Sequence, residues 1–186
     1  MVARQFIAET ERLPDHAHVL LITTGSVASI KAPLIVSALL QYQNVRVEVV
    51  ATKESLAFYD PADVVNAGAR VWTDEDEWSG SYKIGDPILH IELRRWADIV
   101  LTSLLRALAP TTPTYVFPAM NTLMYEHPLT AEHLHVVRDV VRYQVVGPIG
   151  KNLACGDVGL GAMTEWRDIV EIVVDQMKLV RKDNKS

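Results

Sequence analysis

The sequence predicts an α/β domain in which a parallel β-sheet is covered by helices on both faces. Two observations support this prediction. First, short apolar runs rich in β-branched residues alternate with segments of helical periodicity, and strands separated by helices pair in parallel through right-handed crossovers. Second, 186 residues with 49% apolar content are enough for one well-filled hydrophobic core but too few for two domains that each have such a core. Ligands of such sheets bind beyond the carboxyl ends of the strands.

The elements follow from these periodicities in chain order. Strands are predicted over residues 18–23, 45–50, 69–73, 98–101, 115–118 and 143–146. A helix is predicted from Ser26 to about Tyr42, and another over 86–98, opening with an Asp-Pro cap. We expect a single domain over 1–186 with loose termini at 1–16 and 181–186.

Composition excludes several classes of function. The formal net charge is −5 and the basic residues are scattered, so a nucleic-acid partner is not expected. One cysteine cannot form an internal disulfide, and no apolar run approaches the ~20 residues that span a bilayer. We therefore expect no membrane association and a cytoplasmic location.

A glycine turn follows the first predicted strand, in the run Thr23-Thr24-Gly25-Ser26-Val27-Ala28-Ser29. A turn that opens a helix presents free backbone N–H groups and the positive end of the helix dipole, where a phosphate can bind. The spacing fits neither a dinucleotide fingerprint nor a Walker loop, which favours a mononucleotide. A serine N-cap on an ordinary helix explains the same residues equally well.

Two further strand ends carry polar residues. Thr52-Lys53-Glu54 follows the second strand and would offer polar groups to a ring or ribityl chain. Asn121 follows the fifth strand, and its amide suits a carboxylate or amide of a substrate. Helix capping is the alternative explanation at both places.

His90 lies beside the apolar stripe formed by Leu89, Leu93 and Trp96 in the second predicted helix. From spacing alone, a lone histidine there is more often a boundary residue than a catalyst. The acidic run 74–77 precedes it, and such a run usually faces solvent. Because no paired His or Cys completes a coordination set, we predict no metal.

The single cysteine, Cys155, stands in a glycine-rich stretch that runs from Leu153 to Met163. Structural cysteines are usually buried among apolar neighbours, whereas reactive ones lie in polar, partly exposed settings. The surroundings of Cys155 therefore favour a loop that displays a functional thiol over a packing role.

Together, these motifs resemble those of the phosphopantothenoylcysteine decarboxylases in the flavin-containing cysteine decarboxylase family. The resemblance covers residues 19–177 and includes Gly25–Ala28, Leu89–Asp98, Pro118–Asn121 and Ala154–Asp157. It implies a flavodoxin-like three-layer sandwich, bound FMN, and a homotrimer with active sites at the subunit interfaces. It also implies decarboxylation of 4′-phosphopantothenoylcysteine to 4′-phosphopantetheine in coenzyme A biosynthesis.

The same resemblance implies roles for individual residues. His90 and Cys155 match catalytic positions, Cys155 as the acid that protonates the intermediate from a clamp over the substrate. The substrate-binding positions are Asn121, Ala154, Gly156 and Met163. The FMN-binding positions are Gly25, Ser26, Val27, Ala28, Thr52, Lys53, Glu54 and Ala119.

The chain departs from the family after Leu101. Relatives continue there into a Ser-Ala-Asn-Thr loop that binds FMN, a helix and a Cys-Asp-Asn-Leu-Leu turn. Here only residues 102–113 connect two strands, close to the minimum of about a dozen for a parallel crossover. Roughly twenty residues are absent, more than ordinary loop variation. A smaller departure is Tyr125, where relatives usually carry Trp.

Two alternatives follow from this departure and from the wider family. The chain would be a non-catalytic or partly catalytic subunit of a mixed trimer, or a halotolerance-type phosphatase inhibitor. Alternatively, it would be a relative of the peptidyl-cysteine decarboxylases or flavin prenyltransferases. The combination of His90, Asn121 and the Cys155 clamp argues against a relative of the peptidyl-cysteine decarboxylases or flavin prenyltransferases.

Overall fold

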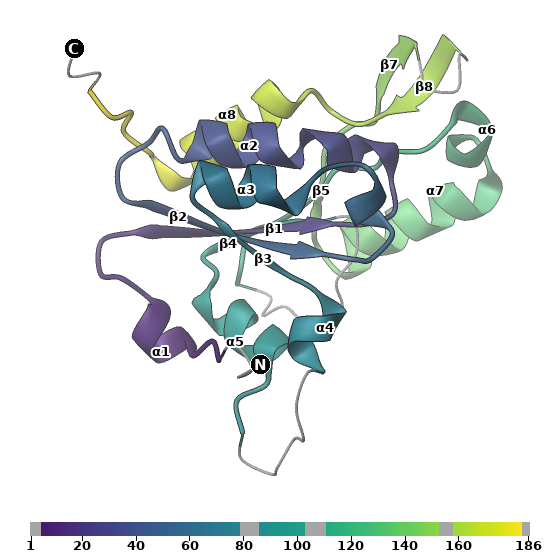
Figure 1. Cartoon of the computed structure of the whole chain (residues 1–186). Helices are drawn as coiled ribbons and strands as arrows, with labels where there is room; N and C mark the ends of the chain where they lie inside the picture. Colours follow the sequence, from purple (N-terminus) through teal and green to yellow (C-terminus); the bar gives the residue numbers. More distant parts are fainter. Residues whose placement is uncertain (1–4, 79–85, 103–110, 153–157, 184–186) are drawn as a thin grey trace.

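A computed structural model of the protein describes residues 5–78, 86–102, 111–152 and 158–183 (Figure 1). Six parallel strands form one sheet in the order β3-β2-β1-β4-β5-β6. The strands are β1 (Ala17–Thr23), β2 (Val45–Ala51), β3 (Arg70–Trp72), β4 (Ile99–Thr102), β5 (Thr114–Val116) and β6 (Gln144–Val145). An antiparallel hairpin, β7 (Ile149–Asn152) and β8 (Val158–Ala162), stands apart from this sheet.

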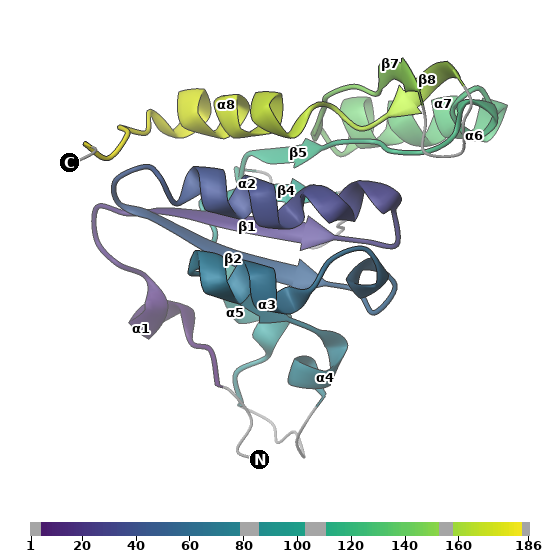
Figure 2. The same cartoon turned by 45° about the horizontal axis from the view of Figure 1, so that its top comes forward.

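Helices cover both faces of the sheet (Figures 1 and 2). One face carries α2 (Ala32–Leu39), α3 (Pro61–Ala67) and α8 (Trp166–Met177), and the other carries α1 (Ala8–Glu11), α4 (Asp74–Glu77) and α5 (Leu89–Trp96). The remaining helical segments are η1 (Val27–Lys31), η2 (Ser55–Ala57), α6 (Thr122–Tyr125), α7 (Pro128–His135) and the π-helical turn η3 (Val136–Val140). None of the described helices is long and apolar enough to cross a bilayer.

The core has two parts because β1 is buried on both faces. Val19 and Leu21 pack with α2, α3 and α8, while Leu20 packs with Trp72 and Trp96 on the other face. A strand with a side-chain period of two sends alternate residues to opposite faces, so a strand covered on both sides reads as a continuous apolar run. This is why the central strands could be predicted from the sequence.

The structure confirms the three-layer α/β sandwich and all six predicted strands. Three local predictions were wrong. The second predicted helix begins at Leu89 rather than at Pro87 and has no side-chain cap of its own. The glycine-rich stretch 153–163 was predicted as a loop, but residues 158–162 form strand β8; Cys155 itself lies outside the described residues. Of the predicted loose segment 1–16, the described part is packed: Phe6 is 2% exposed, and Ala8 donates its N–H to the buried Glu92 carboxylate at 2.8 Å.

The N-terminal segment is held by a cluster of charges and rings. Arg70 donates hydrogen bonds to the carboxylates of Glu48 and Glu11, and its guanidinium lies over the rings of Phe6 and Trp72. Burial raises the pKa of Glu48 more than its hydrogen bonds with Arg70 and Trp72 lower it. This buried carboxylate therefore depends on its partners, and the described N-terminal residues from Phe6 to Glu11 are fixed rather than loose. At the other end of the chain, Lys182 donates hydrogen bonds to the carbonyl oxygens of residues 40 and 41.

A buried histidine links the amino ends of β1 and β4. His18 Nδ1 lies 2.8 Å from Asp98 Oδ2, while His18 Nε2 accepts a hydrogen bond from the N–H of Leu13 at 3.2 Å. A ring nitrogen that accepts carries no proton, so Nδ1 donates to Asp98. Burial lowers the pKa of His18 more than Asp98 raises it. The native protein therefore holds this imidazole neutral.

We predict that this histidine makes stability fall in mild acid. The pKa of His18 is lowered in the native state from its ordinary value of 6.5, so the unfolded chain takes up the proton first as pH falls. Its contribution is present above pH 6.5 and is lost below that value. Urea unfolding of wild type and His18→Gln between about pH 7 and pH 5 measures the difference. A variant with the same pH dependence as wild type would contradict the prediction.

Candidate functional site

The turn after β1 is the first part of the candidate site. The Ser26 hydroxyl oxygen accepts a hydrogen bond from the N–H of Ala28 at 3.3 Å and so caps η1, which leaves its own proton free to donate. Ser29 donates its hydroxyl to the carbonyl oxygen of Thr24 at 2.7 Å. A Cβ at Gly25 would lie 3.0 Å from Cβ of Glu54, so glycine lets this turn approach the loop after β2.

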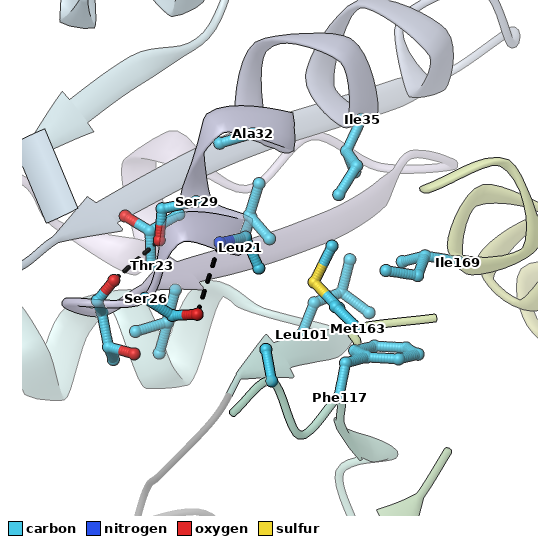
Figure 3. Close-up of a pocket in the computed structure, with 14 residues that line it drawn as sticks. Leu21, Thr23, Ser26, Ser29, Ala32, Ile35, Leu101, Phe117, Met163 and Ile169 are labelled. Carbon is cyan, nitrogen blue, oxygen red and sulfur yellow. Dashed lines mark hydrogen bonds between the residues drawn. The ribbon is translucent and has the colours of Figure 1, made fainter. Parts of the chain in front are cut away.

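A cavity of about 110 Å³ opens at this turn (Figure 3). Residues from separate parts of the chain line it: Ser26 and Ala28 after β1, Ala119 after β5, and Met163 after β8. Its apolar wall includes Leu21, Ala32, Ile35, Leu101, Phe117 and Ile169. The structure thus brings together four of the residues assigned to FMN or substrate, at the carboxyl edge of the sheet.

The loop after β2 lies at the same edge but does not line the cavity. The N–H of Thr52 donates to the carbonyl oxygen of Thr23 at 3.1 Å, which joins the ends of β1 and β2. Lys53 and Glu54 are exposed. In the described part of the chain, the buried Thr52 hydroxyl oxygen has no hydrogen-bond partner. Burying such a group without a partner costs about 1–3 kcal/mol, which indicates a place for a polar ligand atom.

A group of buried hydroxyls supports both loops and was missed by sequence reasoning. The Thr23 hydroxyl lies 2.9 Å from that of Ser55 and 3.1 Å from that of Tyr59. Ser55 also donates to the carbonyl oxygen of Thr52 at 2.8 Å. Burial raises the pKa of Tyr59. Thr23 at the end of an apolar strand was the only local sign of this group, because its partners come from other segments.

Asn121 begins α6, and the hairpin lies against it. Its Oδ1 accepts a hydrogen bond from the N–H of Met124 at 2.8 Å, so the capping role predicted as an alternative is present. The side-chain NH₂ remains available to donate. The N–H of Met120 donates to the carbonyl oxygen of Gly161 in β8 at 2.8 Å. The hairpin that flanks Cys155 is therefore anchored on the Asn121 loop; Cys155 itself, with Ala154 and Gly156, lies outside the described residues.

His90 lies on the opposite face of the sheet, in the first turn of α5. Its Nδ1 is 2.9 Å from Glu77 Oε1, and its backbone N–H donates to Glu77 Oε2 at 3.0 Å. Both side chains line a second cavity, of about 230 Å³, whose floor includes Leu20, Ile22, Val50 and Trp72. The prediction that the acidic run faces solvent is wrong for Glu77, whose side chain is 11% exposed.

The two cavities share only Ile22 among their lining residues. Ser26, Ala28, Ala119 and Met163 line one, and His90 lines the other. The described part of one chain therefore does not bring the predicted catalytic histidine into the cavity beside the glycine turn.

Comparison with known families matches the chain to the model described as "Flavoprotein". The match covers residues 7–103 and 98–178 as two segments. The two segments overlap at residues 98–103, which contain β4, beside the point after Leu101 where the sequence departs from the resembled family. The division agrees with an absent segment between β4 and β5.

Curated relatives include enzymes of the resembled group. Phosphopantothenoylcysteine decarboxylase from Arabidopsis thaliana is 42% identical over 178 residues, which cover 84% of this chain and 83% of that protein. A "probable thymidylate synthase" from Schizosaccharomyces pombe is also 42% identical, over an alignment of 205 residues that includes 97% of this chain. The chain spans about a third of the length of this second relative, since the matched region is 33% of it.

Two solved structures have the same fold over nearly their whole length. HAL3 from Cryptococcus neoformans is 46% identical with a TM-score of 0.77, covering 88% of this chain and 97% of that chain. A PPC decarboxylase mutant complexed with pantothenoylaminoethenethiol is 38% identical with a TM-score of 0.78, covering 88% and 99%. These similarities confirm the flavodoxin-like fold implied by the sequence resemblance.

We predict that Gly161 is required to seat the hairpin. Its φ is +146°, and a Cβ there would lie 2.2 Å from the carbonyl oxygen of Met120. Gly161→Ala must therefore move β8 away from the Asn121 loop. We expect faster proteolysis within the hairpin and a loss of about 1–3 kcal/mol in the free energy of unfolding.

Gly150→Ala is the matched control on the neighbouring strand. A Cβ at Gly150 meets only a Leu160 side-chain atom, at 3.9 Å, so this variant should behave as wild type. Equal proteolysis rates and unfolding free energies for the two variants would show that the close approach at Gly161 does not hold the hairpin.

Proposed function

The chain belongs to the Flavoprotein family, and we propose that it is a single-domain, FMN-dependent decarboxylase of 4′-phosphopantothenoylcysteine that yields 4′-phosphopantetheine for coenzyme A biosynthesis. The observation that carries the proposal is the convergence of Ser26, Ala28, Ala119 and Met163 on one cavity at the carboxyl edge of the sheet. A relative that is 42% identical over 84% of this chain bears the name of this enzyme.

The strand-end loops fit an FMN group. The turn at Ser26 offers a hydroxyl proton and backbone N–H groups, which suit a phosphate or ribityl oxygen. Among the described residues, the buried side-chain polar atoms without a partner are the hydroxyl oxygens of Thr52 and Thr122. Thr52 lies in the loop after β2 that is assigned to FMN, and Thr122 is the first residue of α6, directly after Asn121. Bound ligand atoms at this edge would satisfy both.

Bound FMN would take two electrons from the cysteine moiety, so that its carboxylate can leave as CO₂, and would return the same two electrons to give the product. The residues of the chain would bind the substrate and donate the proton that the reaction needs. The NH₂ group of Asn121 is free to donate to the substrate carboxylate, because Oδ1 is engaged by Met124. Cys155 would give the proton that completes the product, and the hairpin that flanks it would exclude water.

We also propose that the working form is a homotrimer, with a mixed trimer as the variant of this idea. The separation of His90 from the cavity at Ser26 supports an oligomer, because a second copy of the chain could bring its own His90 to that cavity. Helices α6, α7 and the π-helical turn also expose large apolar side chains that a partner would cover: Leu123, Met124, Leu129, Val136 and Val140. The cytoplasmic location stays a prediction.

The second candidate function is a non-catalytic or partly catalytic subunit, including a halotolerance-type phosphatase inhibitor. The shortened connection between β4 and β5 favours it, since the family's Ser-Ala-Asn-Thr loop for FMN would fall there. The divided family match at residues 98–103 supports this absence. The similarity to HAL3 from Cryptococcus neoformans is compatible with either function.

FMN titration of the purified chain tests the first function against the second. We expect a bound-flavin absorption spectrum that survives gel filtration, and about 5- to 30-fold weaker binding by Ser26→Ala, because one hydrogen bond to the ligand is lost. Ser37→Ala, an exposed serine in α2, is the control and should bind as wild type. Protein that stays colourless with FMN would favour the subunit function, and unchanged binding by Ser26→Ala would remove that residue from the site.

We predict that Cys155→Ser separates the two halves of the reaction. A serine hydroxyl is a much weaker acid than a thiol, so CO₂ release should continue while formation of 4′-phosphopantetheine stops. Mass spectrometry of the products, with wild type as control, measures both. Full product formation by the variant would refute the proton-donor role. A cysteine-terminated peptide as substrate separates this activity from peptidyl-cysteine decarboxylation.

A further inference from the structure

The acidic helix α4 lies against the first turn of α5, and the Glu77 side chain joins the two. Glu77 uses both carboxylate oxygens on His90, one on the imidazole Nδ1 at 2.9 Å and one on the backbone N–H at 3.0 Å. The neighbouring residue Glu75 is exposed, whereas the Glu77 side chain is 11% exposed. One carboxylate thus contacts both the ring and the main chain of the same residue.

This contact fixes which ring nitrogen carries the proton. An ionised carboxylate can only accept hydrogen bonds, so the neutral imidazole must hold its proton on Nδ1. Nε2 is then the nitrogen with a lone pair, and Glu77 does not occupy it. The His90 side chain is 62% exposed, so a reacting molecule can reach the ring.

The contact also replaces a missing helix cap. The residue before α5 is Ile88, which has no side-chain acceptor for the free N–H groups of the first turn. Glu77 accepts from one of them and places a negative charge at the positive end of the helix. The helix that carries Glu77 is capped at its own start. The Asp76 carboxylate accepts hydrogen bonds from the N–H and the hydroxyl of Thr73, the N-cap of α4, at 2.9 and 3.0 Å.

We infer that Glu77 is a positioning residue for the decarboxylation: it holds His90 as the Nδ1–H tautomer, with Nε2 directed to the substrate. The inference rests on the proposed catalytic role of His90. The logic is that of a carboxylate that orients a catalytic imidazole, where loss of the partner leaves the wrong tautomer and slows turnover. Glu77 touches neither substrate nor FMN in this scheme.

The first test reads the tautomer directly and does not depend on activity. Long-range ¹H–¹⁵N correlation spectra of ¹⁵N-histidine-labelled protein, with His90 assigned from a His90→Gln spectrum, should show Nδ1–H and bare Nε2 in wild type. Glu77→Leu removes the acceptor at similar size and should shift the population toward Nε2–H. Glu77→Gln keeps one acceptor oxygen and should show a smaller shift. Glu75→Gln removes the same charge from the same helix and should match wild type.

The second test uses turnover of 4′-phosphopantothenoylcysteine. We expect Glu77→Leu to lower kcat about tenfold or more with KM within about twofold, and Glu77→Gln to restore part of the loss. If Glu77→Leu fails to fold, Glu77→Gln alone should show a smaller but measurable change in both tautomer and kcat. Wild-type tautomer and kcat in the folded Glu77 variants would overturn the inference. An inactive wild type, or an unimpaired His90→Gln, would instead overturn the proposed function, and the spectra would still decide whether Glu77 sets the ring.

Discussion

The architecture depends on the parallel pairing of β1 with both β2 and β4. β1 is hydrogen-bonded along its length to β2, from Ala17 opposite Val45 to Thr23 opposite Ala51, and its centre also pairs with β4. The connections from β1 and β2 run over one face through α2 and α3, whereas the return from β3 to β4 crosses the other face through α5. Chain order in the sheet reverses between β1 and β4, and ligands of open α/β sheets bind beyond the carboxyl ends of the strands at such a point; the glycine turn at Gly25 lies there.

Much of this fold could be predicted because its information is local. Strands buried on both faces need apolar side chains at successive positions, which makes 19–22 and 99–101 recognisable without knowledge of their partners. The turn at Gly25 and Ser26 was recognisable because glycine and a capping hydroxyl are required by the chain's own geometry there. The site residues contributed by strand ends were therefore predicted together with the strands.

The rest could not be predicted because it depends on contacts between distant segments. Glu77 looks like one of four equivalent acids, and only the position of α5, which begins twelve residues later, turns it inward. Phe6 lies in a polar N-terminal segment, yet it is buried because its ring packs against the ring of Trp72 and the guanidinium of Arg70. The hydroxyl group of Thr23, Ser55 and Tyr59 likewise joins three segments. Periodicity describes one element at a time and cannot identify such partners.

The sheet itself accommodates the short connection between β4 and β5. Val100, Leu101 and Thr102 pair in parallel register with Thr114, Tyr115 and Val116 although only residues 103–113 separate the two strands. Both strands are also buried where they are described, with Val100 and Ile99 at 0% exposure and Tyr115 at 5%. Parallel pairing and core burial therefore do not require the longer segment of the resembled family. Its absence bears on the ligand edge of the sheet, where an FMN-binding loop would stand, and the effect of the shortening must be sought in cofactor affinity rather than in the fold.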